Sequence, residues 1–94
     1  MYRLTRTSTF KKRYQKLTRK NSKLRIQITS CFNSMRNDPF HKFLRTHKVL
    51  TPKYGLTYSS RITGDLRIIW KFHNDKAVIL LITLGGHSGN QRVY

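Results

Sequence analysis

Two arginines on either side of a short turn are well placed to bind an anion. Arg61 and Arg67 flank Thr63-Gly64-Asp65, in a segment where apolar side chains alternate. If Ile62 pairs with Leu66, matching parity puts Arg61 opposite Arg67 on the face away from the apolar side chains. Directly opposed cations destabilise a sheet, so the pair makes best sense as a clamp for an anion. The alternative is a solvated outer face whose register differs by one residue.

Three further side chains could assist an anion held there. Lys71 continues the same face along the second strand. Asp65 is an ordinary turn residue, although its position also lets it orient a cation or hold a proton. His87 follows the most apolar strand after two glycines, so we expect its imidazole at a strand end beside the arginines, where it can transfer protons near neutral pH. The simpler alternative for His87 is an exposed loop residue.

The remaining reactive residue types have weaker patterns. Tyr94, the last residue, could stack on a base or simply fray. Cys31 falls on the apolar face of a predicted helix, which favours a core role over a nucleophilic one. As the single cysteine it excludes an intrachain disulfide and suits a reducing cytoplasm. The acidic residues are isolated and no phosphate-binding glycine motif occurs, so we expect no metal and no cofactor.

Charge dominates the composition. The 94 residues include 20 Lys and Arg, 3 acidic residues and no Glu, for a formal net charge of +17. Such self-repulsion points to a polyanionic partner, nucleic acid above all, or to an acidic protein. With 37% hydrophobic residues, including Trp70, the chain has too much core material for a disordered tail. We expect one folded domain over residues 1–94, with secretion and membrane insertion disfavoured.

The elements that must position these residues can be read from periodicity. A weak strand is predicted at residues 2–5, and Thr7-Ser8 and Asn21-Ser22 offer caps for two helices, the second ending at Asp38-Pro39. Residues 40–54 have no clean period and predict a loop with at most one turn. Three strands are then predicted, at 56–62, 66–72 and 77–84, with turns at 63–65 and 74–75 and an end at Gly85-Gly86. The order predicts an α+β fold, a helical hairpin packed on one face of a small antiparallel sheet.

The last third of the chain resembles a known family. Arg61-Ile-Thr-Gly-Asp-Leu-Arg-Ile-Ile-Trp70, the apolar strand Ala77–Leu84, Gly-Gly-His87-Ser88 and the terminal aromatic are similar to the RelE/ParE superfamily of bacterial toxins, and most similar to its YafQ-like branch. The resemblance implies a single RelE-like toxin domain, a metal-independent and ribosome-dependent mRNA endonuclease of a type II toxin–antitoxin system. Its implied partners are mRNA on the ribosome, with contacts to rRNA, and an acidic antitoxin in a hetero-oligomer.

The same resemblance implies roles for individual residues. His47 resembles the loop histidine of YafQ-like toxins, Asp65 their hairpin aspartate, and His87 their histidine after the last strand. Arg67 matches a strand arginine that acts on the scissile phosphate, and Tyr94 stands for the terminal aromatic. Two departures are that Arg61 replaces a histidine and that the tail after His87 is longer.

Together these residues supply what RNA cleavage needs. Attack by the 2′-hydroxyl requires a base, cations for the charge on phosphorus and an acid for the leaving 5′-oxygen. In this hypothesis His87 is acid or base, His47 or Asp65 is its counterpart, Arg61 and Arg67 hold the phosphate, and Tyr94 stacks on a base. Two other classes remain open. They are a ParE-like gyrase poison and a non-enzymatic RNA-binding protein of ribosomal type, for which the arginines are plain phosphate contacts.

Overall fold

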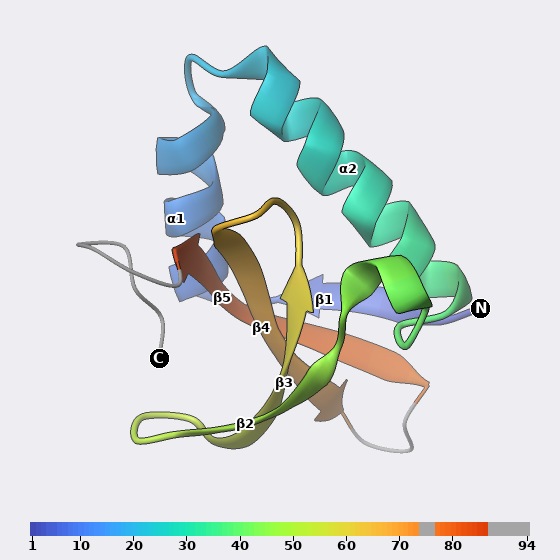
Figure 1. The fold of residues 1–94 in the computed structure, drawn as a ribbon. Coiled ribbons are helices and arrows are strands. Elements are labelled where there is room, and N and C mark those ends of the chain that lie inside the picture. Colours follow the sequence, from blue (N-terminus) through green and yellow to red (C-terminus); the bar gives the residue numbers. More distant parts are fainter. Residues whose placement is uncertain (74–76, 87–94) are drawn as a thin grey trace.

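The computed structural model describes residues 1–73 and 77–86 and shows two helices on one face of a five-stranded sheet (Figure 1). The elements are β1 (Arg3–Arg6), α1 (Ser8–Thr18), α2 (Ser22–Asn37), a 3-10 turn η1 (Lys42–Leu44), β2 (His47–Thr51), β3 (Gly55–Arg61), β4 (Leu66–His73) and β5 (Val78–Gly86). This is the predicted α+β class. In the described part of the chain, no helix combines the length and the apolar character needed to cross a membrane.

Both helices begin at the capping residues that the sequence indicated. The Thr7 side chain accepts a hydrogen bond of 3.0 Å from the Phe10 N–H, and the Asn21 side chain accepts one of 3.0 Å from the Leu24 N–H. Each bond satisfies an amide that has no partner inside the helix. Helix α2 ends at Asn37 because Asp38 adopts an extended backbone conformation before Pro39.

The sheet order is β1-β5-β4-β3-β2, which puts the apolar strand β5 inside the sheet as its sequence predicted. Strands β2 to β5 are antiparallel, but β1 pairs with β5 in parallel, from Arg3↔Val78 to Arg6↔Leu81. The sheet is therefore mixed rather than purely antiparallel. A parallel pair needs a long connection, and here everything from α1 to β4 lies between its two strands.

The segment predicted as a loop, residues 40–54, instead contains η1 and the edge strand β2. Strand β2 pairs with β3 from His47↔Ser59 to Thr51↔Gly55. Most side chains of β2 are exposed, so its sequence shows little apolar alternation. Its pairing with β3, and not a buried face, defines it as a strand. The glycines expected to end the last strand are instead its final two residues, since Gly85 pairs with Arg67 and Gly86 with Leu66.

The core lies between the helices and the sheet. It is formed by buried residues of the helices and the strands together: Phe10, Ile28, Cys31, Met35, Leu44, Leu66, Ile68, Trp70, Ile79, Leu81 and Leu84. Trp70 is fully buried, and its indole N–H donates a 2.7 Å hydrogen bond to the Ser60 hydroxyl. Cys31 is buried in this core, as predicted. The opposite face of the sheet is not covered by either helix and carries the candidate site (Figure 1).

Candidate functional site

The predicted pairing of the two arginines is confirmed. Arg61 and Arg67 are direct cross-strand partners on β3 and β4, and Ile62 donates its backbone N–H to the Leu66 carbonyl at the end of the same ladder. Because Ile62 and Leu66 pack against the core, the alternation of side chains puts both arginines on the helix-free face. Both side chains are partly buried.

The two guanidinium groups differ in how they are held. Arg61 donates from Nε to the Thr63 carbonyl at 3.2 Å, which turns its side chain toward the 63–65 turn. Arg67 has a buried Nε with no hydrogen-bond partner. A buried donor on a cation is costly when unsatisfied, and the nearby cation Arg61 adds repulsion. An anion between the two side chains would relieve both costs.

The structure also fixes the backbone behind these arginines. Cys31 Sγ on α2 lies 3.8 Å from the Arg61 carbonyl oxygen. Burial raises the pKa of the Cys31 thiol to about 12, so this group is a neutral packing residue and not a nucleophile.

The end of β5 is held from the other side by α1. Past the end of β1, the Thr7 hydroxyl donates to the Ile82 carbonyl at 2.6 Å and Arg13 donates to the Leu84 carbonyl at 3.3 Å. These bonds cover the β5 edge where it runs on past β1 and fix Gly85, the cross-strand partner of Arg67.

His47 lies on the same face as the arginines. It is the cross-strand partner of Ser59, which precedes Arg61 by two positions on β3. The imidazole is exposed, and its Nδ1 lies 3.1 Å from the Arg45 carbonyl oxygen. His47 is thus two strands away from Arg67, next to Arg61 along the diagonal of the sheet.

The other predicted site residues are placed less closely together. Asp65 is exposed in the turn between the arginine strands. Lys71 is exposed on the same face, four residues along β4 from Arg67, which is about 13 Å along the strand. His87 and Tyr94 lie outside the described residues.

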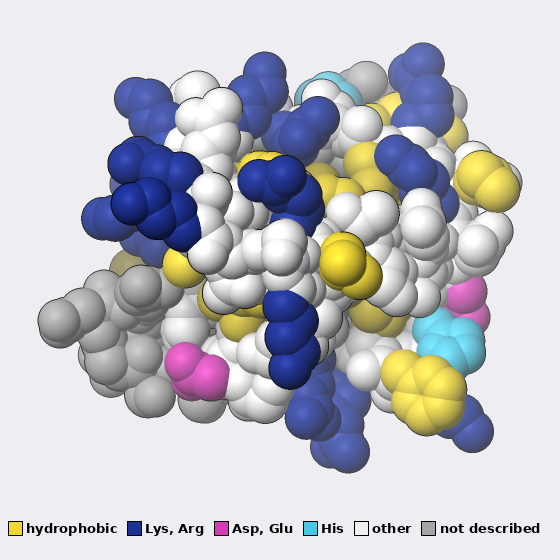
Figure 2. All heavy atoms as spheres, turned by 90° about the horizontal axis from the view of Figure 1, so that it is seen from above, with side chains coloured by type: hydrophobic (Ala, Val, Ile, Leu, Met, Phe, Trp, Pro, Cys, Tyr) yellow, Lys and Arg dark blue, Asp and Glu magenta, His cyan; other side chains and the backbone are white. Residues whose placement is uncertain are grey.

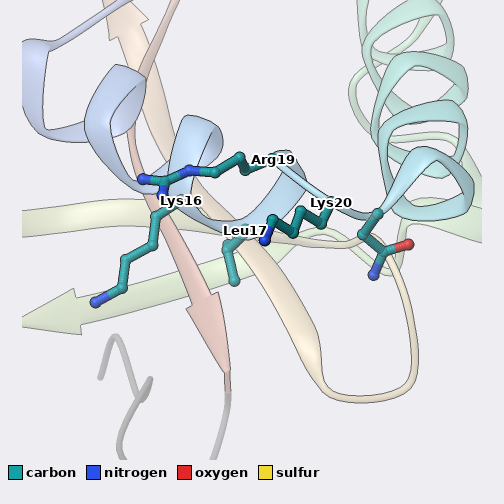
Figure 3. A pocket seen from close by; sticks show the side chains of 5 residues that line it. Lys16, Leu17, Arg19 and Lys20 are labelled. Carbon is teal, nitrogen blue, oxygen red and sulfur yellow. The ribbon is translucent and has the colours of Figure 1, made fainter.

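Sequence reasoning missed two polar features. The hydroxyl of Thr83, a residue whose β4 partner is Ile69, is buried and has no hydrogen-bond partner, and it lies beside Arg67 in the next row of the sheet. A basic pocket of about 420 Å³ is formed where α1 meets the turn into α2. It is lined by Lys16, Leu17, Arg19, Lys20 and Asn21 (Figure 3). The dense run of Lys and Arg from 11 to 20 was the available signal for it.

Basic side chains are not confined to that pocket. Figure 2, seen from the helix side, shows Lys and Arg side chains at many places over this surface, with few acidic side chains among them. Such a surface gives salt-sensitive affinity for polyanions. Among residues 1–73 and 77–86, no group of three or more His, Cys, Asp or Glu is arranged to hold a metal ion.

No family model matches this sequence, and no curated protein matches it significantly. Solved structures do match its fold. The YoeB/ParE toxin from Agrobacterium tumefaciens has a TM-score of 0.75 at 16% identity, covering 92% of this chain and 99% of that one. A chain of the YoeB–YefM complex from Staphylococcus aureus has a TM-score of 0.71 at 18% identity, covering 94% and 99%. A chain of the E. coli DinJ–YafQ toxin–antitoxin complex has a TM-score of 0.70 at 17% identity, covering 93% and 94%.

These matches extend over more than nine-tenths of each chain. They agree with the resemblance stated from the sequence, although the sequence identities are low. The chain therefore has the fold of the YoeB/ParE- and YafQ-type toxins.

Proposed function

We propose that this chain is the toxin of a type II toxin–antitoxin system and that it arrests translation by cutting mRNA. The observation that carries the proposal is the partly buried arginine pair, in which Arg67 Nε has no acceptor. The fold shared with YoeB/ParE- and YafQ-type toxins makes this reaction class the first to consider.

The proposed reaction uses the nucleophile that RNA already carries. A base removes the proton of the 2′-hydroxyl, the oxygen attacks the adjacent phosphorus, and an acid protonates the 5′-oxygen as it leaves. The 2′,3′-cyclic phosphate and a new 5′-hydroxyl are the products. Arg67 and Arg61 stabilise the negative charge that develops on the phosphate oxygens. No metal and no cofactor enters this scheme.

Proton transfer is assigned to the predicted histidines and aspartate. His87 acts as one partner, and His47 or Asp65 acts as the other. His47 is supported by its place on the arginine face, and Asp65 by its place in the turn that joins the two arginine strands. Tyr94 holds a base by stacking.

The remaining positive charge serves a large RNA surface. We assign the basic pocket at the α1–α2 turn to phosphate contacts with the ribosome, which would make cleavage ribosome-dependent. An acidic antitoxin neutralises the toxin in the cytoplasm. The toxin–antitoxin complexes among the structures of similar fold support this partner.

Expression in a bacterial host tests the proposal. Induction should arrest growth, and primer extension on abundant mRNAs should show new 5′ ends. Arg67→Gln and His87→Ala should each abolish both effects while the protein still accumulates. Asp65→Asn and His47→Gln distinguish the two candidates. Substitution of the residue that transfers the proton should lower the rate of mRNA cleavage by about two orders of magnitude or more, and substitution of the other should not.

Two results would contradict the proposal. If growth stops while mRNA stays intact and the supercoiling activity of DNA gyrase is inhibited, the chain would instead be a ParE-like gyrase poison. Harmless expression at a high level would indicate a non-enzymatic RNA-binding protein.

A further inference from the structure

The end of the β2–β3 hairpin separates from β4, while β4 continues to pair with β5. Strand β3 pairs with β2 from Gly55 to Ser59 but with β4 only from Tyr58 to Arg61. Residues 49–57, here called the hairpin ribbon, are therefore two-stranded, and Figure 1 shows this end away from both helices. Two strands alone are marginally stable in water, and both edges of such a ribbon are open to pairing.

The hairpin ribbon carries an exposed apolar pair. Leu50 and Leu56 are direct cross-strand partners, and they are 77% and 62% exposed. They lie on the same side of the strands as Tyr58, because side chains two residues apart share a face. Phe40, which is half exposed, packs edge-on against Tyr58 at 5.3 Å between ring centroids. Single exposed apolar residues are common, but a contiguous set marks an interaction surface.

The charges around this surface indicate the kind of partner. No acidic residue occurs from 39 to 64. Lys48 is exposed on the same side as Leu50, opposite Tyr58, and Lys53 lies in the turn with its ammonium 5.5 Å from the centre of the Tyr54 ring. The nearest acidic group on the N-terminal side, Asp38, accepts the Phe40 N–H at 3.0 Å.

A second copy of this chain is a poor occupant of the surface. Each copy carries a formal charge of +17, and the surface itself presents lysines and no carboxylate. Two such surfaces would repel one another, whereas an acidic chain would be attracted.

We propose that the hairpin ribbon is a docking surface for the acidic antitoxin. This inference rests on the proposed function. An extended antitoxin segment lies along the free edge of β2, places apolar side chains over Leu50 and Leu56, and directs carboxylates to Lys48 and Lys53. Main-chain pairing and apolar contact provide the affinity, and the lysines provide the charge selectivity. The hairpin ribbon is separate from the arginine pair. An antitoxin segment docked on the ribbon therefore binds the toxin without occupying the phosphate site.

The experiment uses the full chain with the protein encoded beside its gene as the antitoxin probe. The double variant Leu50→Thr/Leu56→Thr keeps side chains suited to a strand while removing the apolar surface. Its matched control is Ile26→Thr, which alters an apolar residue on α2 that is 69% exposed. Growth arrest, rescue by co-expressed antitoxin and binding by calorimetry are measured for each.

The double variant should still arrest growth, but its binding to the antitoxin should weaken by roughly thirtyfold or more, and rescue should fail. Ile26→Thr should arrest growth and be rescued like the unchanged chain. Lys48→Glu gives a second test that leaves the apolar pair intact, and it should weaken binding most at low salt.

Three outcomes would overturn the inference. Full rescue of the double variant at unchanged affinity would show that the antitoxin binds elsewhere, while the proposed function would stand. Loss of growth arrest with antitoxin binding intact would assign the ribbon to the ribosome, and self-association of the unchanged chain that the double variant abolishes would assign it to a second copy. If the unchanged chain causes no arrest, the proposed function fails and this inference fails with it.

Discussion

Arg61 and Arg67 face one another across β3 and β4, and only Arg61 has its Nε satisfied, by the Thr63 carbonyl. Two cations in register lower the stability of a sheet, and a buried donor without an acceptor lowers it further. The arginine pair therefore lowers the stability of the folded chain, as is common at preorganised ligand-binding sites.

This relationship predicts opposite effects on activity and stability. Arg67→Gln should lower mRNA cleavage by roughly 10²–10³-fold, because one donor to the transition-state charge is lost. The melting temperature should stay the same or rise, since the repulsion is removed. Cleavage assays beside thermal unfolding check this.

The control for that variant is Arg3→Gln, which removes the same charge from an exposed position on β1. It should leave cleavage nearly unchanged. An Arg67→Gln protein that loses activity only because it unfolds would contradict the assignment.

The basic pocket at the α1–α2 turn predicts a change in salt dependence. In Lys16→Gln/Lys20→Gln, two phosphate contacts are lost, so the slope of log binding constant against log salt should flatten by roughly 1.5. Fluorescence anisotropy with labelled RNA measures the slope. Lys48→Gln/Lys53→Gln removes equal charge from the hairpin ribbon and the residue before it, and this variant should change the slope less. Equal effects in the two variants would mean that RNA binding is spread evenly over the surface.

The buried hydrogen bond beneath the site predicts a loss of stability. Ser60→Ala would leave the Trp70 indole N–H without its acceptor and would remove the 2.6 Å contact with the Thr46 hydroxyl. The free energy of unfolding should fall by about 1–3 kcal/mol, measured in urea. Ser30→Ala, an exposed change on α2, should stay within about 0.5 kcal/mol. Equal effects would contradict a role for the Ser60–Trp70 bond.

The raised pKa of the buried Cys31 thiol predicts that the folded chain loses stability at high pH. Its pKa is raised by burial to about 12, above the value of about 8.5 for a free thiol, so the folded state disfavours the thiolate. The stabilisation is fully present below about pH 8.5 and is lost as pH rises toward 12. Iodoacetamide at pH 8.5 should react far more slowly with the folded chain than with the urea-unfolded chain. The decline in stability above pH 8.5 should be smaller in Cys31→Ala, and equal alkylation rates in the two states would disprove the burial argument.

The predictions from sequence succeeded where the deciding interactions are local. Thr7 and Asn21 were identified as caps because a cap bonds to an amide three residues away. The Arg61–Arg67 register was predicted from a short turn and the matching parity of Ile62 and Leu66, beside an alternative shifted by one residue, and the structure has the predicted register.

The predictions from sequence were wrong or incomplete where contacts between distant segments determine the structure. Strand β2 was missed because an exposed edge strand has little apolar pattern, and the parallel direction of β1 depends on a strand far along the chain. The unsatisfied Arg67 Nε depends on side-chain geometry that no sequence pattern encodes. The basic run from 11 to 20 was a signal for the pocket between Lys16 and Asn21, but its shape depends on how α1 meets the turn into α2. The roles of all the candidate site residues stay predictions, and His87 and Tyr94 lie outside the described residues.

The pairing of β1 with β5 has a consequence for how the chain is made. The Thr7 hydroxyl bonds to the Ile82 carbonyl across 75 positions, and the faces of α1 and α2 are buried only once β4 and β5 are in place. Contacts so far apart must wait for closure of a long loop, which slows folding. During synthesis the first half of the chain therefore has no sheet to pack on. Under the proposed function, toxin activity should appear only after β5 has emerged from the ribosome, and an antitoxin made beforehand would then be present when the toxin first folds.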